Sequence, residues 1–490
     1  MKDSRPPLSR GVQQDMTQPE MPLDLVAQPQ VPPAASGPYP VRTGNIVRPL
    51  VDGIPAFRRI GEAIDGARHS VWLTVTFFAP DFRFPDGDGS LFDVLDHAVA
   101  RGLDVRVIFW RPNPESSGYG RTFPGSQAER DLLQARGSRF RIRWDRAHAA
   151  YCQHQKSWVF DAGQPTETAF VGGTNLTSKA MGLPGHFGGG ERHDLYVEVT
   201  GPSATDVHHN LIQRWNEASE READDGVWAD NASETLPFPT RLSDPQGTSL
   251  VQIQRMVHPG HYTDGHPTPG GLPYNIAAGE RSILEQYELA IDAARSTIYI
   301  ENQAIPVPAV AVRLRRALER GVDVVLLVPA HPEDHVYAAR KDPARRSLFD
   351  GIEALARYQN FLLAGLVTVD RRAGPRSTYV HAKIMLVDDV WATIGSCNLH
   401  SNSLSGPTEM NAAIWDPEVV RALRSELLAE HLDQKVDSLY DRAALRLYRQ
   451  VATRNRLTAS KRGSNFQGLA IALTASEYGT ERYGPEPAAK

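Results

Sequence analysis

The spacing of apolar residues along the chain predicts helices and strands that occur in matched pairs. Residues 61–78 and 280–303 each begin with apolar positions at helical spacing and end in a β-prone apolar run. Residues 90–110 and 310–328 have the same order, with a glycine that ends the helix before a buried strand. We therefore expect two copies of a helix–strand unit, far apart in the sequence.

One offset relates the two copies over a long stretch of the chain. A shift of 227 positions carries Ala67 onto Ala294, and the same shift carries His154 onto His381. A constant offset across separate elements indicates that a whole domain is duplicated, rather than one short motif. The expected fold class is α/β, with two tandem domains.

The composition along the chain predicts where these domains begin and end. We expect an N-terminal domain over 46–240 and a C-terminal domain over 245–460, joined by an acidic, turn-rich linker. Residues 1–45 are rich in Pro and Gln and are expected to form a disordered leader, because such a composition cannot bury a core. Residues 461–490 are expected to form a similarly weak C-terminal tail.

Each copy contains a predicted β-hairpin that begins with a histidine. In the second copy, HAKIMLV and VWATIG are β-prone runs joined at Asp388 and Asp389. Antiparallel pairing about this turn would bring His381 near Ser396, with Asn398 just beyond the same end. We expect the corresponding residues of the first copy to close in the same way, over a longer turn.

The alternation of side chains along a strand separates the polar residues of each hairpin. In the first copy, His154 and Lys156 are two positions apart and share a face, whereas Asp161 has the opposite parity. The corresponding residues of the second copy are His381, Lys383 and Asp388. The aspartates are therefore expected to support the hairpin and not to act on a substrate.

A histidine, a lysine and an asparagine at one end of a hairpin form a donor set that suits a phosphate. The lysine supplies a point charge and the amide supplies a directed donor. Two such sets together would provide two lysines and two imidazoles, so that no metal is needed at phosphorus. One imidazole can then attack phosphorus while the other, protonated, donates its proton to the leaving oxygen. We expect no cofactor and no metal site.

Chance is the alternative explanation of the His-x-Lys pairs. The chain has 53 Lys and Arg residues, of which only 8 are lysine, so a lysine is scarce where arginine supplies the general surface charge. One His-x-Lys is expected about 0.3 times by chance in a chain of this composition. A second copy, with aspartate again five positions after the lysine, argues against coincidence.

These residues resemble the signature of the phospholipase D superfamily, which is H-x-K-x4-D followed by G-S/G-x-N, present twice in two-domain members. The resemblance covers about residues 46–435 and implies a mixed sheet flanked by helices in each domain, with a pseudo-twofold relation between domains. One departure is Gly173, where serine is usual. The catalytic residues it implies are His154, Lys156, Asp161, His381, Lys383 and Asp388, with Asn175, Ser396 and Asn398 binding the substrate.

The resemblance also implies a role for two carboxylates that follow the motifs. Asp194 and Glu409 would accept hydrogen bonds from the imidazoles, which fixes their orientation and raises the basicity of the other ring nitrogen. We expect Asp194 to orient His154 as the nucleophile. We expect Glu409 to serve the second motif, whose His381 would be the general acid.

The flanking residues narrow the expected activity. Residues 191–216 and 280–303 resemble stretches of phospholipases D, which implies hydrolysis of phosphatidyl diesters to phosphatidic acid and a free head group through a phosphohistidine, with transfer to alcohols as a further reaction. A cardiolipin synthase-type phosphatidyltransferase is the alternative, although such enzymes usually carry N-terminal membrane helices. A phosphodiesterase nuclease is less favoured.

The net charge and the hydropathy of the chain indicate which partners and which location to expect. A formal net charge of −5 gives no support for broad capture of nucleic acid, so none is expected as a partner. No run approaches the roughly 18 apolar residues of a transmembrane helix. We expect a phospholipid substrate reached peripherally at a membrane surface, and a cytoplasmic or peripheral membrane location; export without a cleavable signal stays open.

Two further candidates carry less weight. The stretch HPGHYTDGHP at 258–267 has enough ligand types for a metal, but its Pro and Gly content favours an exposed loop, either bordering the substrate entrance or without a specific role. Cys397 lies inside the second motif and is expected to be a small buried thiol, not a nucleophile. The candidate metal ligands in the stretch 258–267 are His258, His261, Asp264 and His266.

Overall fold

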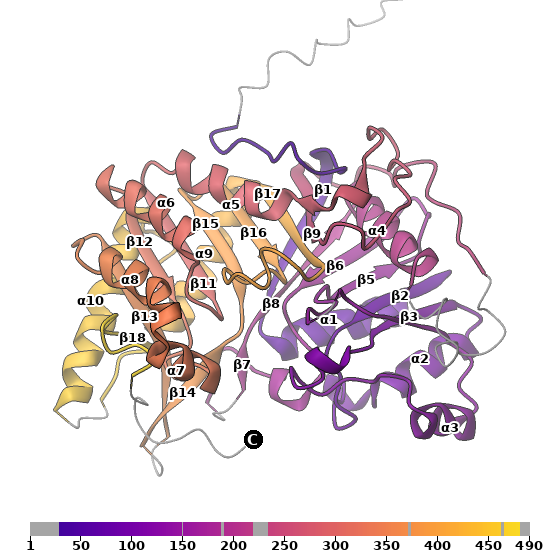
Figure 1. Cartoon of the computed structure of the whole chain (residues 1–490), viewed down its shortest axis with the longest axis horizontal. Helices are drawn as coiled ribbons and strands as arrows, with labels where there is room; N and C mark the ends of the chain where they lie inside the picture. Colours follow the sequence, from indigo (N-terminus) through magenta and orange to yellow (C-terminus); the bar gives the residue numbers. More distant parts are fainter. Residues whose placement is uncertain are drawn as a thin grey trace, which may run out of the picture.

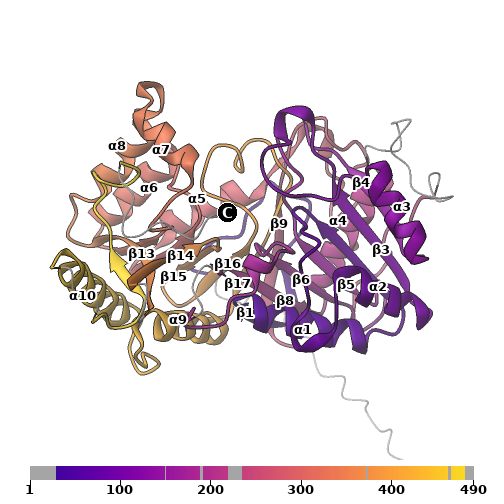
Figure 2. The same cartoon turned by 90° about the horizontal axis from the view of Figure 1, so that it is seen from below.

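In the computed structural model of the protein, two halves of similar architecture lie side by side (Figure 1). The N-terminal half runs from indigo to magenta and the C-terminal half from rose-red through orange to yellow, and the two halves also lie side by side in the view from below (Figure 2). The structure describes residues 29–148, 150–187, 191–218, 234–370, 374–461 and 465–480.

The N-terminal half is built on one mixed sheet. Its strands are β1 (Arg42–Val51), β2 (Ser70–Val75), β3 (Asp104–Trp110), β4 (Arg141–Asp145), β5 (Ser157–Phe160), β6 (Thr168–Gly172) and β8 (Leu195–Thr200). Their order is β4-β3-β2-β5-β6-β8-β1. β2, β3 and β4 are parallel and the other neighbours are antiparallel. Helical crossovers join the parallel strands, as parallel pairing requires.

The sheet of the C-terminal half repeats this order strand for strand. Its strands are β9 (Ser249–Val257), β11 (Thr297–Asn302), β12 (Asp323–Leu327), β13 (Phe361–Asp370), β15 (Lys383–Val387), β16 (Trp391–Gly395) and β17 (Glu409–Trp415). Their order is β13-β12-β11-β15-β16-β17-β9. The duplicated α/β fold with a mixed sheet in each domain is therefore confirmed.

The two sheets meet where the first strand of each half pairs with the other. β1 and β9 are antiparallel, with Arg42 opposite Val251 and Asn45 opposite Ser249. Because β1 and β9 hold equivalent positions in their sheets, an antiparallel pairing between them relates the halves by a pseudo-twofold axis. The same axis then brings equivalent ends of the other strands toward one another.

Helices cover both faces of the sheets. In the N-terminal half these are α1 (Gly53–Gly66), α2 (Leu91–Ala100), α3 (Gln127–Arg136) and α4 (Ala204–Asn216). In the C-terminal half they are α5 (Ser282–Ala293), α6 (Pro308–Glu319), α7 (Asp334–Lys341), α8 (Arg346–Leu355), α9 (Pro417–Leu432) and α10 (Asp441–Ser460). α2 illustrates the local rules, because a capping box between Ser90 and Asp93 starts it and Leu91, Leu95 and Ala98 form its buried face.

The apolar core has one layer that is continuous through both halves. α4 packs on the first sheet through Val207 and Leu211, and α9 packs on the second through Leu423 and Leu427, within a single buried cluster. Separate clusters lie on the opposite faces, beneath α1 and α2 in one half and beneath α5, α6 and α8 in the other. A shared layer fixes the two halves relative to each other, because buried side chains are close-packed.

Part of the predicted disordered leader is packed. Within residues 29–45, Val31 and Tyr39 are buried, and Trp415 Nε1 donates a hydrogen bond of 2.7 Å to the carbonyl of Val31. The composition argument failed for these residues because their apolar side chains join a core that the two domains already form. The remainder of that leader, residues 1–28, lies outside the described residues.

The predicted C-terminal tail also contributes structure. Within residues 461–490, the short strand β18 (Ala470–Ala472) pairs antiparallel with β13, and Tyr478 is buried.

The other short strands are β7 (Arg192–His193), β10 (Glu280–Arg281) and β14 (Gly374–Val380). Across the described part of the chain, no helix combines the length and the apolarity needed to cross a membrane.

Candidate active site

The two His-x-Lys motifs begin the hairpins that the sequence predicts. His154 and Lys156 lie immediately before β5, and His381 lies two residues before the start of β15 at Lys383. β15 pairs with β16 with Ile384 opposite Ile394, which confirms the hairpin. All four side chains are buried, with residue exposures of 7% for His154, 3% for Lys156, 3% for His381 and 1% for Lys383.

Each imidazole is held by a carboxylate from the other half of the chain. His154 Nδ1 lies 2.8 Å from Glu409 Oε2, and His381 Nδ1 lies 2.5 Å from Asp194 Oδ2. The expectation that Asp194 orients His154 is therefore wrong, and so is its counterpart for Glu409. The spacing in the sequence allows each carboxylate to reach the histidine of its own half or of the other half. The pseudo-twofold packing of the two sheets places it against the histidine of the other half, and this arrangement is called the crossed pairing below.

Backbone hydrogen bonds repeat the crossing. The His154 N–H donates to the carbonyl of Thr408 at 2.9 Å, and the His381 N–H donates to the carbonyl of His193 at 2.8 Å. Thr408 and His193 are the residues just before the two orienting carboxylates. Each motif histidine is thus fixed twice by one short segment of the opposite half, through its backbone and through its ring.

The glycine that departs from the usual motif makes the two sites unequal. Ser396 Oγ donates to Glu409 Oε2 at 2.6 Å, so this carboxylate has a hydroxyl donor besides the imidazole. A Cβ atom at Gly173, the equivalent position, would lie 2.4 Å from Asp194 Oδ1. Serine does not fit there in this structure, and Asp194 has no such hydroxyl donor from position 173.

The electrostatics of the two carboxylates follow this difference. Burial raises the pKa of Asp194 to about 6. Burial acts in the same direction on Glu409, but the His154 imidazole, Lys156 and the Ser396 hydroxyl together hold the pKa of Glu409 below its ordinary value. Glu409 is therefore the more firmly ionised of the two, which favours a more basic ring at His154.

Both motif lysines are buried, and no carboxylate of the described residues forms an ion pair with either of them. Lys156 Nζ donates to the carbonyl of His154 at 2.8 Å, and Lys383 Nζ donates to the carbonyl of His381. Burial lowers the pKa of Lys156 to about 8 and that of Lys383 to about 7. Burying an ammonium group without an anion is unfavourable, so the arrangement favours the binding of an anionic group between the two motifs.

The same burial disfavours the protonated form of both imidazoles in the absence of a ligand. Burial lowers the pKa of His154, and burial together with the nearby Lys383 and Arg192 lowers the pKa of His381 well below its ordinary value. A phosphodiester anion in the site would oppose these effects. A neutral ring can attack phosphorus, and a ring that gains a proton once the anion is bound can protonate the leaving oxygen.

The lowered pKa values of the lysines predict how anion binding depends on pH. We expect the affinity for sulfate, whose charge is constant over this range, to fall between pH 7 and 9 by up to about tenfold per pH unit for each lysine that loses its proton. Isothermal titration calorimetry in two buffers of different ionisation enthalpy would measure both the affinity and the protons taken up. Affinity that is independent of pH would contradict these pKa directions.

The asparagines of the two motifs follow the second strand of each hairpin, β6 and β16, and are buried. Asn175 and Asn398 are both 4% exposed. Their Oδ1 atoms are buried and accept no hydrogen bond from the described residues. An amide oxygen accepts hydrogen bonds and cannot bind a phosphodiester oxygen, so the contact of these asparagines to a substrate stays a prediction that rests on their N–H₂ groups. Ser396, predicted as a third contact, is instead occupied with Glu409.

The two motif aspartates lie at the far ends of their strands and support the backbone there. Asp161 Oδ1 accepts hydrogen bonds from the backbone N–H groups of His69 at 2.7 Å and Arg68 at 2.9 Å. Asp388 accepts from Ser296 at 2.8 Å and Thr297 at 2.7 Å. Each carboxylate holds the turn before a central strand, so the expectation of a supporting role agrees with the geometry.

Replacing Asp388 with asparagine is expected to lower stability and leave the chemistry nearly unchanged. The amide presents an N–H₂ group to backbone N–H donors, which leaves a donor without an acceptor at a cost of about 1–3 kcal/mol. Thermal unfolding and kcat would be measured together, with the exposed Asp437→Asn as a control. A loss of kcat beyond about tenfold with unchanged stability would instead assign Asp388 to the chemistry.

The other residues singled out in the sequence do not form a second site. His261 Nε2 lies 2.6 Å from Gln153 Nε2, and His258 stacks on His148 with ring centroids 4.1 Å apart, so the 258–267 loop borders the first motif. Among the described residues its four candidate ligands are not grouped as a metal site. The thiol of Cys397 is buried, and burial raises its pKa well above the ordinary value.

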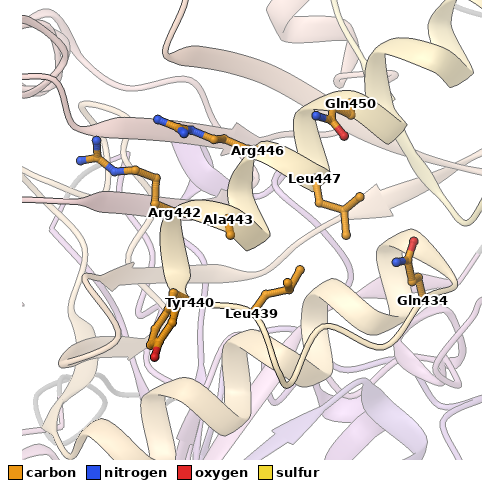
Figure 3. A pocket seen from close by; sticks show the side chains of 8 residues that line it. All are labelled: Gln434, Leu439, Tyr440, Arg442, Ala443, Arg446, Leu447 and Gln450. Carbon is orange, nitrogen blue, oxygen red and sulfur yellow. The ribbon is translucent and has the colours of Figure 1, made fainter.

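A surface pocket at the start of α10 is separate from the motifs. Figure 3 shows Tyr440, Arg442 and Arg446 along one side of it. Neither motif contributes to its lining, so the pocket plays no part in the chemistry considered for the histidines. The full lining is Gln434, Leu439, Tyr440, Arg442, Ala443, Arg446, Leu447 and Gln450.

Two residues near the second motif were not recognised in the sequence. Gln303 Oε1 lies 3.3 Å from Lys383 Nζ, and the Arg192 guanidinium lies 5.4 Å from the ring centroid of Tyr379. Both belong to the flanking stretches 191–216 and 280–303 that resemble phospholipases D. That resemblance was the available signal, although it did not identify individual side chains.

Comparison with known proteins agrees with this geometry. The family model described as cardiolipin synthase, PLD-like domain, matches residues 60–215 and 288–430. The chain is 27% identical to cardiolipin synthase A of Pseudomonas entomophila over 418 residues, covering 83% of this chain and 71% of that protein. It is 23% identical to a cardiolipin synthase of Listeria welshimeri, covering 82% and 72%.

A solved structure has the same fold over most of the chain. The phosphatidylserine synthase of Haemophilus influenzae Rd KW20 aligns with a TM-score of 0.50 and 13% sequence identity, covering 85% of this chain and 94% of that one. The two matched segments of the family model fall one in each half and contain the two His-x-Lys motifs. The chain is thus a member of the phospholipase D superfamily, with two PLD-like domains and the architecture of an enzyme that acts on phosphodiester bonds.

Proposed function

We propose that this protein is a phosphatidyltransferase of the cardiolipin synthase type. The observation that carries the proposal is the crossed site, in which two buried imidazoles, each oriented by a carboxylate of the other half, flank two buried lysines. The similarity to proteins named cardiolipin synthase over more than four fifths of the chain supports transfer over hydrolysis. This reverses the order of preference given by the sequence alone.

The proposed reaction has two displacements at phosphorus. His154 attacks the phosphorus of a phosphatidylglycerol, the bond to glycerol breaks, and His381 donates a proton to the departing glycerol oxygen. The hydroxyl group of a second phosphatidylglycerol then loses its proton to His381 and attacks the phosphohistidine. The P–N bond breaks, cardiolipin leaves, and both histidines return to their starting states.

Two features of the site support an alcohol as the acceptor. The motif side chains are almost fully buried, which limits access of bulk water to a phosphohistidine. The lysines compensate the charge of the phosphodiester without a metal at phosphorus. A phospholipid surface, approached peripherally, is the proposed source of both donor and acceptor.

The proposal is tested by identifying every product formed from phosphatidylglycerol vesicles. We expect cardiolipin and glycerol in equal amounts, and neither product with the His154→Ala variant. Phosphatidic acid as the main lipid product would instead identify a hydrolytic phospholipase D, the second candidate, which the flanking stretches 191–216 and 280–303 favour. Cleavage of single-stranded DNA without any lipid product would overturn both.

A further inference from the structure

A second group of ionisable side chains lies buried behind the proposed active site and takes no part in it. The group joins both halves of the chain, because its members come from the β1–α1 corner, the 181–187 loop, β7, β11 and α9. None of these side chains is more than 6% exposed. They are Asp52, His186, His193, Glu301, Glu430 and His431.

Four of these side chains surround one point. His186 Nε2 lies 3.3 Å from Asp52 Oδ2, 3.3 Å from His193 Nδ1 and 3.4 Å from Glu430 Oε1. The ligand atoms of all four residues lie within 4.8 Å of one another. Four ligands at about 2.0–2.1 Å from a tetrahedral zinc ion are about 3.3–3.4 Å apart, so the three spacings measured at His186 match those around such an ion.

Two carboxylate oxygens in this cluster are poorly paired. Asp52 Oδ2 and Glu430 Oε2 are buried and form no hydrogen bond with the described residues, although Asp52 Oδ2 lies within ion-pair distance of His186 Nε2. Buried carboxylate oxygens without donors are costly unless they are paired with a cation. Two carboxylates and two neutral imidazoles carry a charge of −2, which a divalent ion neutralises.

The surrounding residues orient the ligands in the way that metal sites require. His193 Nε2 lies 3.0 Å from Glu301 Oε2, and Glu301 Oε1 accepts a hydrogen bond of 2.7 Å from Tyr299. A proton fixed on Nε2 by this carboxylate directs the lone pair of Nδ1 toward the centre of the cluster, as in carboxylate–histidine–zinc arrangements. The Gly185 N–H donates to Glu430 Oε1 at 2.9 Å and orients that side chain.

From this geometry we propose that Asp52, His186, His193 and Glu430 bind a divalent cation of the zinc type. The nitrogen and oxygen donors and the three spacings at His186 favour Zn²⁺ over Mg²⁺ or Ca²⁺, which prefer six or more oxygen ligands. The ion does not contact the substrate. It joins Glu430 of the second half to three residues of the first.

The position of the ion gives it a structural role beside the proposed active site. The carbonyl of His193 accepts hydrogen bonds from the N–H groups of His381 and Ala382, at 2.8 and 3.1 Å. The neighbouring residue Asp194 contacts the His381 ring. An ion that fixes His193 therefore fixes the segment that holds the second motif histidine.

A proton is the competing occupant. His193 Nδ1 lies 2.9 Å from Asp52 Oδ1 and its Nε2 lies 3.0 Å from Glu301 Oε2, so a doubly protonated ring would donate to both carboxylates and offset one of their two negative charges. That arrangement needs no metal. The two explanations differ in metal content, and in whether zinc stabilises the fold.

The test measures metal and stability, and neither readout depends on the activity of the protein. The full-length protein is produced without a metal-affinity tag in zinc-supplemented medium and analysed by inductively coupled plasma mass spectrometry. We expect one zinc per chain, a fall in Tm of several degrees after removal with a chelator, and recovery on adding zinc alone. X-ray absorption should show nitrogen and oxygen ligands without sulfur, which excludes binding by the cysteines.

Variants locate the ion. His186→Ala is expected to lose the zinc and the stabilisation by zinc, whereas His209→Ala should keep both, because His209 is a buried histidine that hydrogen-bonds Tyr39 and His266 instead. Glu430→Gln provides a second variant with the same expectation if His186→Ala does not fold. Zinc-free wild-type protein whose Tm does not respond to zinc, or zinc retained by both cluster variants, would overturn the proposal.

Discussion

Replacing His154 with alanine is expected to abolish the covalent phosphoenzyme, whereas His381→Ala should still form it slowly from a substrate with an activated leaving group. A p-nitrophenyl phosphodiester needs little help from an acid, so the variant that lacks the acid keeps the first displacement. The variant that lacks the nucleophile loses it, together with at least about 10⁴-fold in rate.

The structure changes the reason for assigning the nucleophile to His154. Its ring is oriented by Glu409, which stays ionised with the help of Ser396, while Asp194 at His381 has a pKa raised to about 6 by burial. A firmly ionised partner makes a neutral imidazole the stronger nucleophile. Ser396→Ala should therefore slow phosphoenzyme formation more than it slows its breakdown.

The assignment is checked by rapid quenching and peptide mapping of acid-labile phosphohistidine. His400→Ala is the matched control, since His400 is a partly buried imidazole near Glu409 that accepts a hydrogen bond from the Ser403 N–H and orients neither motif histidine. It should keep the full burst of p-nitrophenol. Phosphate on residue 381 in the wild type, or a burst that survives His154→Ala and disappears in His381→Ala, would reverse the roles.

Replacing Lys383 with methionine is expected to remove activity and raise stability at the same time. Methionine has a similar length and no charge, so kcat/KM should fall by at least about 10³-fold as stabilisation of the phosphoryl oxygens is lost. The free energy of unfolding should rise near pH 6, because the wild type must bury an ammonium group there. Above about pH 7, Lys383 is neutral in the folded protein but still protonated in the unfolded chain. The free energy of unfolding of the wild type therefore increases as the pH rises above about 7.

The pH dependence separates this effect from ordinary repacking. The gain in Tm for Lys383→Met should shrink between pH 6 and pH 9, since the wild-type lysine is already neutral at the higher pH. The exposed Lys435→Met serves as the control and should show no such trend. A gain that is the same at both pH values would show that the charge of Lys383 is not what destabilises the fold.

The sequence was sufficient for features that depend on periodicity and spacing. The helix–strand units at 61–78 and 280–303, the hairpin around Asp388 and the placing of each lysine on the face of its histidine all follow from local rules. The supporting role of the aspartates also followed, because strand parity alone places them opposite the histidines. Duplication strengthened each prediction, since every element had a second copy to match.

The features that were missed depend on how the halves pack. Spacing alone allows Asp194 to reach either histidine, and only the antiparallel pairing of β1 with β9 decides that it reaches His381. The packing of Val31 was missed for the same reason, since its contacts belong to a core formed elsewhere in the chain. The cluster around His186 has no sequence spacing of its own, because its ligands come from four separate segments.

Because histidines and carboxylates pair across the two domains, neither domain contains a complete site, and the two must be preserved together. After a duplication, one copy of a domain is ordinarily free to accumulate changes while the other preserves the activity. Here a change at Asp194 or Glu409 removes the carboxylate that orients the imidazole of the opposite copy. Neither copy is therefore free to change without an effect on the other. The two halves already differ within this shared site, because Gly173 in one half stands where the other half has Ser396.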